Sequence, residues 1–200
     1  MGANDRILIS IGADGISIDA PRAQLDVAAP VRIAGASIPL PRSDWTEQGG
    51  TCGGLVVPRD GASPYYLVAA LVPEARIEPA KFGKLEALAG VSSPWDGQAN
   101  MRALLAADPE NVIANRIKAL HVGGHADWFW PSRLDSAVLY ANVGDMVREF
   151  LGAWGAWICE QHPDFPSIAY VQTFDSGNQG WGHKGNEFGA VAVRRVYPVL

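Results

Sequence analysis

The sequence predicts an α+β fold in which short helices pack on a small antiparallel sheet, preceded by a short β-rich arm. Three observations lead to this class. Glycine (22 residues) and proline (14) are abundant and only 18% of residues are charged, which favours a turn-rich fold over a helical bundle. Short runs that alternate apolar and polar residues recur between turns, as in half-buried strands. A few segments place apolar residues at helical spacing, two of them behind a capping residue.

The arm is expected over residues 1–41, which differ in character from the rest. Its apolar residues alternate with small or polar ones in four short runs: Ile7 to Ile11, Ile16 to Ile18, Leu25 to Val27 and Val31 to Ile33. The first two runs flank a Gly-Ala-Asp-Gly turn, which predicts a hairpin. Strands with one thin apolar face bury too little area to be stable alone. We therefore expect self-association or docking on a larger assembly; the alternative is an extension of the main sheet.

The main domain is expected over residues 42–200, after a hinge at Pro39 to Ser43. Cys52 to Val57 and Tyr65 to Val72 are β-prone runs separated by a strong turn, and they predict a hairpin. Three further strands are expected near the C-terminus, the last two half-buried: Ala156 to Cys159, Ile168 to Phe174 and Ala190 to Val196.

Three helices are expected in the middle of the chain. The first runs to Ala107 from a capping residue, Asp96. The second covers residues 111–120 and has an apolar stripe that should be buried: Val112, Ile113, Ile117 and Leu120. Ser132 is expected to cap the third, which continues to Leu151.

The charge and cysteine content exclude several classes of protein. A formal charge of −5 does not suit a surface that neutralises phosphates, so we expect no nucleic-acid partner. No run approaches the ~18 apolar residues of a membrane span, and Asp5-Arg6 stands where a signal peptide would have a basic run followed by a long apolar core. We expect no membrane insertion and synthesis in a cytoplasm. Cys52 and Cys159 are too few for a disulfide framework and are expected to be buried thiols.

Nothing in the sequence predicts catalysis, a metal or a cofactor. No GxSxG elbow is present, and neither cysteine stands beside a histidine or in a CxxC pair. His121 and His125 have zinc-ligand spacing for a helix, but the two glycines between them favour a turn. Asp175 to Asn178 could offer oxygen ligands to calcium; the same residues also make an ordinary hairpin turn, which we favour.

Two loops are candidates for recognition. The longer, residues 178–188, places three aromatic residues and a lysine, Trp181, His183, Phe188 and Lys184, among glycines and asparagines. The shorter covers residues 161–167. Recognition surfaces use amphipathic aromatics with flexible polar neighbours, because these combine contact area with hydrogen bonding. The alternative is that Trp181 and Phe188 pack inward and anchor a long connection.

From Trp45 onward the chain resembles the Lcl C-terminal domain family. The resemblance rests on an ordered set of segments that spans about three quarters of the chain: WTEQGG (45–50), PYYLVAA (64–70), DGQANMRALL (96–105), GGHADWFWPSRLDSAVLYANV (123–143), WICEQ (157–161), AYVQTFDSGNQ (169–179) and VAVRRV (191–196). It does not reach residues 1–41. The family usually has Trp-Ser-Ser-Thr where this chain has Trp157-Ile-Cys-Glu160, so its ligand is not carried over.

The resemblance implies a C-type-lectin-like fold, in which long loops vary on one side of a fixed framework. Members often occur among phage virion proteins, and phage relatives of the fold are receptor-binding adhesins, commonly trimeric. On this basis Trp157, Trp181, His183 and Lys184 are expected near the exposed face. The tryptophans expected in the framework are Trp45, Trp128 and Trp130. The full set of candidate ligand-binding residues is Trp157, Glu160, His162, Asn178, Trp181, His183, Lys184 and Asn186.

We therefore interpret the chain as a phage virion protein, on a tail or particle surface, that displays a lectin-like surface to a receptor or glycan of the host cell. Its partners should be other virion proteins and copies of itself, most simply as a trimer. The alternative is a decoration protein that stabilises the particle and binds nothing outside it. Formylglycine-generating enzymes share the fold but need a cysteine or copper-site arrangement that this sequence does not supply, so we expect no enzyme activity.

Overall fold

The computed structural model separates the chain into two units, residues 1–40 and 41–200. The residues that the structure describes are 9–12, 15–18, 31–33, 36–59 and 61–198. The division falls at the proline-rich hinge, and the attachment role of the first unit stays a prediction.

The described residues of the first unit form two short hairpins. Strand β1 (Ile9–Gly12) pairs antiparallel with β2 (Gly15–Ile18), which confirms the first expected hairpin. Strand β3 (Val31–Ile33) pairs antiparallel with β4 (Ala36–Ile38). The strand expected over residues 25–27 lies outside the described residues.

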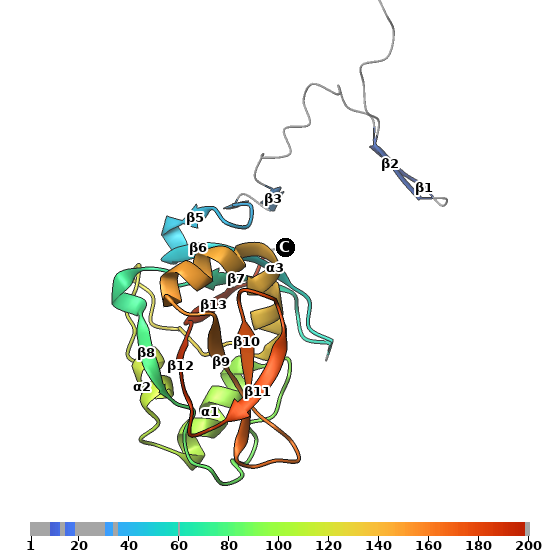
Figure 1. The fold of residues 1–200 in the computed structure, drawn as a ribbon. Coiled ribbons are helices and arrows are strands. Elements are labelled where there is room, and N and C mark those ends of the chain that lie inside the picture. The colour runs from blue at the N-terminus through green and yellow to red at the C-terminus, as the bar shows by residue number, and fades with distance from the viewer. Residues whose placement is uncertain (1–8, 13–14, 19–30, 34–35, 60, 199–200) are drawn as a thin grey trace, which may run out of the picture. The chain divides into compact units, whose positions relative to one another are not determined.

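The second unit is mixed α+β, as predicted, and its described residues form two sheets and three α-helices (Figure 1). The five-stranded sheet has the order β11-β10-β9-β12-β8 and the four-stranded sheet the order β13-β7-β6-β5. The strands are β5 (Asp44–Trp45), β6 (Gly50–Val56), β7 (Tyr65–Ala69), β8 (Ile77–Lys81), β9 (Gly155–Gln161), β10 (Ile168–Thr173), β11 (Gln179–His183), β12 (Glu187–Ala190) and β13 (Val193–Val196). Neighbouring strands are antiparallel except β12 with β9, so the larger sheet is mixed.

Two strand predictions need correction. The strand expected over residues 190–196 is two strands, because the chain leaves β12 of the larger sheet and enters β13 of the smaller one. Between them the Ala192 carbonyl accepts a hydrogen bond from the Ala70 amide. Strand β10 is buried on both faces from Ala169 to Gln172 rather than half-buried, because helix α3 packs on it and Arg133 covers Tyr170.

The helices are α1 (Gly97–Ala107), α2 (Val112–Lys118) and α3 (Arg133–Leu151), and they confirm the three expected. Asp96 and Ser132 cap α1 and α3 as predicted, and Ser132 forms a capping box with Asp135. Val112 was expected in the buried stripe of α2 but is 66% exposed. It is the first residue of the helix, and the inward positions begin at Ile113, whose partner one turn later is Ile117.

The core is rich in tryptophan. Trp130 donates its indole N–H to the Trp157 carbonyl (2.8 Å), and Trp157 donates its own to the Ala80 carbonyl (3.0 Å). Trp45 and Trp128 are also buried, which confirms the three framework tryptophans. A buried indole is stable only when its N–H finds a partner, so these bonds fix both rings.

Both cysteines are fully buried thiols, as predicted. Cys52 lies in β6 and Cys159 in β9. Burial raises the pKa of each thiol, which keeps it protonated at neutral pH.

A buried polar network fixes the start of α3. The Tyr65 hydroxyl donates to the Asp135 carboxylate (2.5 Å), which also accepts from the Ser132 amide (2.9 Å) and hydroxyl (2.7 Å). The Arg195 guanidinium lies over the Tyr65 ring at 4.4 Å. Burial raises the pKa of Asp135, and the bonds from Tyr65 and Ser132 oppose that rise. The network joins β7, β13 and α3, so the first residue of α3, Arg133, has a fixed position.

Candidate ligand-binding surface

The segment expected to be a long recognition loop, residues 178–188, is mostly regular structure. It forms β11, a tight turn and the start of β12 (Figure 1). The turn expected at Asp175 to Asn178 is confirmed: it joins β10 to β11, and Gly177 there has a positive φ of 79°. The feature that distinguishes this strand from a loop is the alternation of glycine with large residues.

In β11 glycines and large side chains point to opposite sides. Gly180 and Gly182 alternate with Trp181 and His183. A Cβ on Gly182 would lie 3.4 Å from the buried Trp157 ring, so this glycine faces the core. Trp181 therefore projects from the outer face and is 66% exposed.

Four rings form what we call the aromatic surface: His162, Phe165, Tyr170 and Trp181. The His162 ring lies 4.8 Å from Phe165, 5.8 Å from Tyr170 and 5.8 Å from Trp181, measured between centroids. Tyr170 and Trp181 face each other across β10 and β11. Phe165 is 58% exposed, whereas Tyr170 is 9% exposed and forms the base. The two segments predicted as recognition loops thus meet at His162.

The short segment that carries Phe165 is held in place by its own hydrogen bonds. The His162 amide donates to the Ile168 carbonyl (2.9 Å), and the Ile168 amide donates to the Phe165 carbonyl (3.0 Å). The His162 ring accepts from the Asp164 amide (3.1 Å). The rings of the aromatic surface therefore stand on an ordered frame.

A buried ion pair lies beside the aromatic surface. Arg133 donates through Nε to the Glu160 carboxylate at 2.8 Å, and its guanidinium carbon stands 4.3 Å from the Tyr170 ring centroid. The Glu160 side chain is 2% exposed and that of Arg133 is 32% exposed. Burial raises the pKa of Glu160 to about 7, against the attraction of Arg133. Glu160 is thus a positioning group for Arg133 and is shielded from an external ligand.

The predicted exposure is wrong for two other candidate site residues. Trp157 and Lys184 were expected near the exposed face, but both are buried. Trp157 belongs to the central strand β9, where its ring packs edge-on against Phe82 and Phe188. Strand β9 lies in the middle of the larger sheet and all of its residues are buried, so a side chain on either face of this strand lies in the core.

Lys184 is a buried residue that links neighbouring segments through hydrogen bonds. Its Nζ donates to the Glu86 carbonyl (2.9 Å) and to the Gln161 side-chain oxygen (3.0 Å). Its amide donates to the Ser167 carbonyl and its carbonyl accepts from the Phe82 amide, so it is clamped between two segments. Burial lowers the pKa of Lys184 to about 8.

The remaining candidates are exposed but stand apart from the four rings. His183 accepts from the Gly185 amide (3.1 Å), and its carbonyl accepts from the Asn186 amide (2.8 Å). The Asn178 carbonyl accepts from Thr173 at the far end of the hairpin. Within the described part of the chain, no ring contact or side-chain hydrogen bond joins these residues to the aromatic surface.

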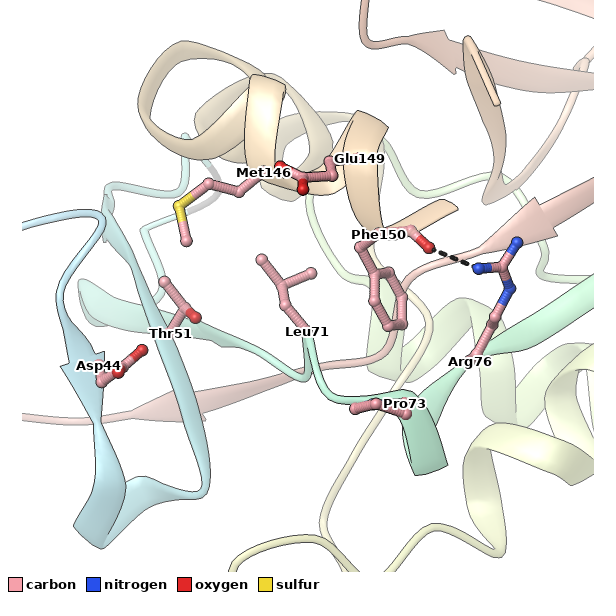
Figure 2. Close-up of a pocket in the computed structure, with 8 residues that line it drawn as sticks. All are labelled: Asp44, Thr51, Leu71, Pro73, Arg76, Met146, Glu149 and Phe150. Atoms are coloured by element: carbon pink, nitrogen blue, oxygen red, sulfur yellow. Dashed lines mark hydrogen bonds between the residues drawn. The ribbon is translucent and has the colours of Figure 1, made fainter. Parts of the chain in front are cut away.

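A separate hollow of about 490 Å³ lies between the end of α3 and the β5–β6 edge (Figure 2). Its lining residues are Asp44, Thr51, Leu71, Pro73, Arg76, Met146, Glu149 and Phe150. Arg76, the most basic group, already donates to the Phe150 and Leu151 carbonyls.

The histidines at 121 and 125 occupy a turn, as predicted. Val122 and His125 form an isolated β-bridge across it, and the His125 ring contacts the Glu47 carbonyl at 2.9 Å. Among the described residues, no three histidine, cysteine or acidic side chains come together as a metal site. None of the helices in that part of the chain is long and apolar enough to cross a membrane.

Comparison with protein-family models gave no match, and a search of curated proteins found no relative. The assignment of function therefore rests on the geometry of the aromatic surface and on the residues that surround it.

Proposed function

We propose that the protein is a phage virion protein whose main domain has a C-type-lectin-like fold and binds a glycan or protein on the bacterial surface. The observation that carries the proposal is the aromatic surface. It exposes Trp181 and Phe165 side by side with His162 on an ordered frame. Large exposed apolar groups of this kind mark sites of interaction.

The chemistry of the aromatic surface suits a sugar ring. The face of a hexose that carries C–H groups packs on an indole or phenyl ring, and its hydroxyls bond to nearby polar groups. Trp181 and Phe165 are 66% and 58% exposed, so covering what remains would contribute at most about 1.5–3 kcal/mol each, which gives a weak single site. Several copies on one particle would bind more tightly through avidity. Because ring contacts already restrict Trp181, its side chain would lose little entropy on binding.

The proposed family is supported by the roles of its segments in the fold. The segment around Trp130 caps and starts α3, and the segment around Trp157 forms the central strand β9. Both tryptophans are hydrogen-bonded in the core. The buried Trp130 has the framework role that the resemblance implies for it, and the exposed Trp181 lies on the outer face that the resemblance implies; Trp157, which the resemblance places near that face, is buried instead.

Residues 1–41 would attach the protein to the particle or trimerise it. Two short hairpins in this unit cannot form a core of their own. We therefore expect multi-angle light scattering of the full chain to give the mass of a trimer. A stable monomer would contradict this part of the proposal.

The experiment that tests the function measures binding of the labelled full chain to a panel of bacterial cells and purified surface polysaccharides. Trp181→Ala should abolish binding. Trp154→Ala is the matched control, because Trp154 is also exposed (53%) but packs on Phe188 instead of on the aromatic surface. Equal loss in both variants, or binding that survives Trp181→Ala, would contradict the proposed site.

The alternative is a decoration protein, and the same observation is compatible with it because an exposed apolar patch can also face a neighbouring subunit. In that case the wild-type chain would bind no cell and no polysaccharide, and Trp181 would be shielded in the assembled particle.

A further inference from the structure

A cleft of about 270 Å³ adjoins the aromatic surface. It is bounded by Arg59, by Pro94 and Trp95, and by the first turn of α3 with Arg133. Gln179 closes it by donating to the Arg133 carbonyl at 2.7 Å. Arg133 belongs to both sites, because its guanidinium also covers Tyr170 at the base of the aromatic surface.

Both arginines of the cleft have guanidinium N–H groups that make no hydrogen bond to a described residue. Arg133 bonds to Glu160 through Nε only, and in the described part of the chain its two terminal nitrogens have no hydrogen-bond partner. Arg59 is exposed and makes no ion pair with a described residue; its one described contact is with the Trp95 ring, 5.9 Å from the centroid. A guanidinium presents its donors in a planar fork that fits a carboxylate.

Around the cleft, Arg59 is a charged group that has no ion pair with a described residue. Glu160 offsets one of the two arginines. Two other described acids are nearby and already have partners: Asp96 bonds to Arg195 (3.1 Å) and to the Ala99 amide (3.1 Å), and the buried Asp135 in the first turn of α3 bonds to Tyr65 and Ser132. The cleft therefore suits a ligand group with a single negative charge.

We propose that this cleft binds the carboxylate of an acidic sugar, with Arg59 and Arg133 as its donors and Trp95 as the wall against the sugar ring. This rests on the proposed function and names its ligand class: a surface glycan in which a uronic or nonulosonic acid stands beside a neutral sugar. The acidic residue occupies the cleft, and the neutral residue lies on the aromatic surface next to Trp181.

The test is a titration of the isotope-labelled full chain by NMR, followed at the tryptophan indole N–H signals. The probes are glucuronate, galacturonate and N-acetylneuraminate, with glucose and galactose as neutral counterparts, each raised to tens of millimolar. We expect the acids to shift the Trp95 signal and the neutral sugars to leave it unchanged. Arg59→Gln should weaken acid binding about tenfold or more, because it removes a charge-assisted hydrogen bond.

Arg116→Gln is the matched control, since Arg116 is an exposed arginine of α2 that lines none of the described pockets. It should bind the acids like the wild type. The proposal is overturned if no acid shifts the Trp95 signal, if glucose shifts it equally, or if both variants lose affinity alike. If the protein in that event still binds cells in a way that depends on Trp181, only the ligand class is wrong. If neither the Trp95 shift by acids nor the Trp181-dependent binding to cells is observed, the proposed function is wrong as well.

Discussion

Replacing Lys184 by methionine tests whether this residue has a structural role in the core or binds a ligand. Methionine keeps most of the length of the side chain but has no charge to titrate. Lys184 is fully buried, and its Nζ bonds to the Glu86 carbonyl and to Gln161. The variant should therefore change how stability depends on pH and leave binding by the aromatic surface intact.

The size of the effect follows from the pKa. Burial lowers the pKa of Lys184 from 10.5 to about 8 in the folded protein, whereas the unfolded chain keeps the ordinary value. Between these two values the unfolded state holds the proton and the folded state does not, so the free energy of unfolding rises with pH. The difference corresponds to roughly 3 kcal/mol. Below about pH 8 the buried charge costs stability, and above pH 10.5 that cost is gone.

The assay is urea denaturation of wild type and Lys184→Met, followed by tryptophan fluorescence, at several pH values across that interval. Other titrating groups cancel in the difference between the two proteins. We expect the wild type to gain roughly 3 kcal/mol relative to the variant as the pH rises from 7 to 10.5. If the unfolding free energies of the wild type and of Lys184→Met change in parallel with pH, the burial of a charged Lys184 is refuted.

Two further perturbations test the packing. Gly177→Ala should cost roughly 2–5 kcal/mol of unfolding free energy, because alanine is strained at φ 79° and its Cβ would meet the Tyr140 ring. Gly61→Ala is the control: Gly61 has a φ of 82° but stands in open space, so this variant should lose only about 1–2 kcal/mol of unfolding free energy. Equal losses for the two variants in denaturant melts would show that the Tyr140 ring moves aside at no cost. Cys52 and Cys159 should react with a thiol reagent only as the chain unfolds, since both are buried and have a raised pKa; rapid labelling of the native protein would contradict this.

Local features of the fold were predictable from the sequence because their causes are local. Asp96 and Ser132 are capping residues directly ahead of apolar residues at helical spacing, and both cap as expected. The alternation of glycine with Trp181 and His183 is also local, and it indicates a strand. The abundance of glycine there favoured a loop instead, which is why β11 was missed.

The candidate site was predictable only in part, because contacts between distant segments decide burial. Composition gave the segments of His162 and Trp181 a recognition role, and the structure brings these two rings within 5.8 Å. Nothing near Lys184 in the sequence shows that Glu86 and Gln161 enclose it. The cleft between Arg59 and Arg133 has no local pattern either, since its walls come from separate segments.

Hydroxyl-radical footprinting of the full chain, free and bound to bacterial cells or polysaccharide, reports directly whether the aromatic surface contacts the ligand. Trp181 and Phe165 are exposed in the free protein, as is Trp154 outside the aromatic surface. We expect binding to protect Trp181 and Phe165 from oxidation and to leave the oxidation of Trp154 unchanged. Protection of Trp154 with undiminished oxidation of Trp181 would contradict this expectation and place the contact on another face.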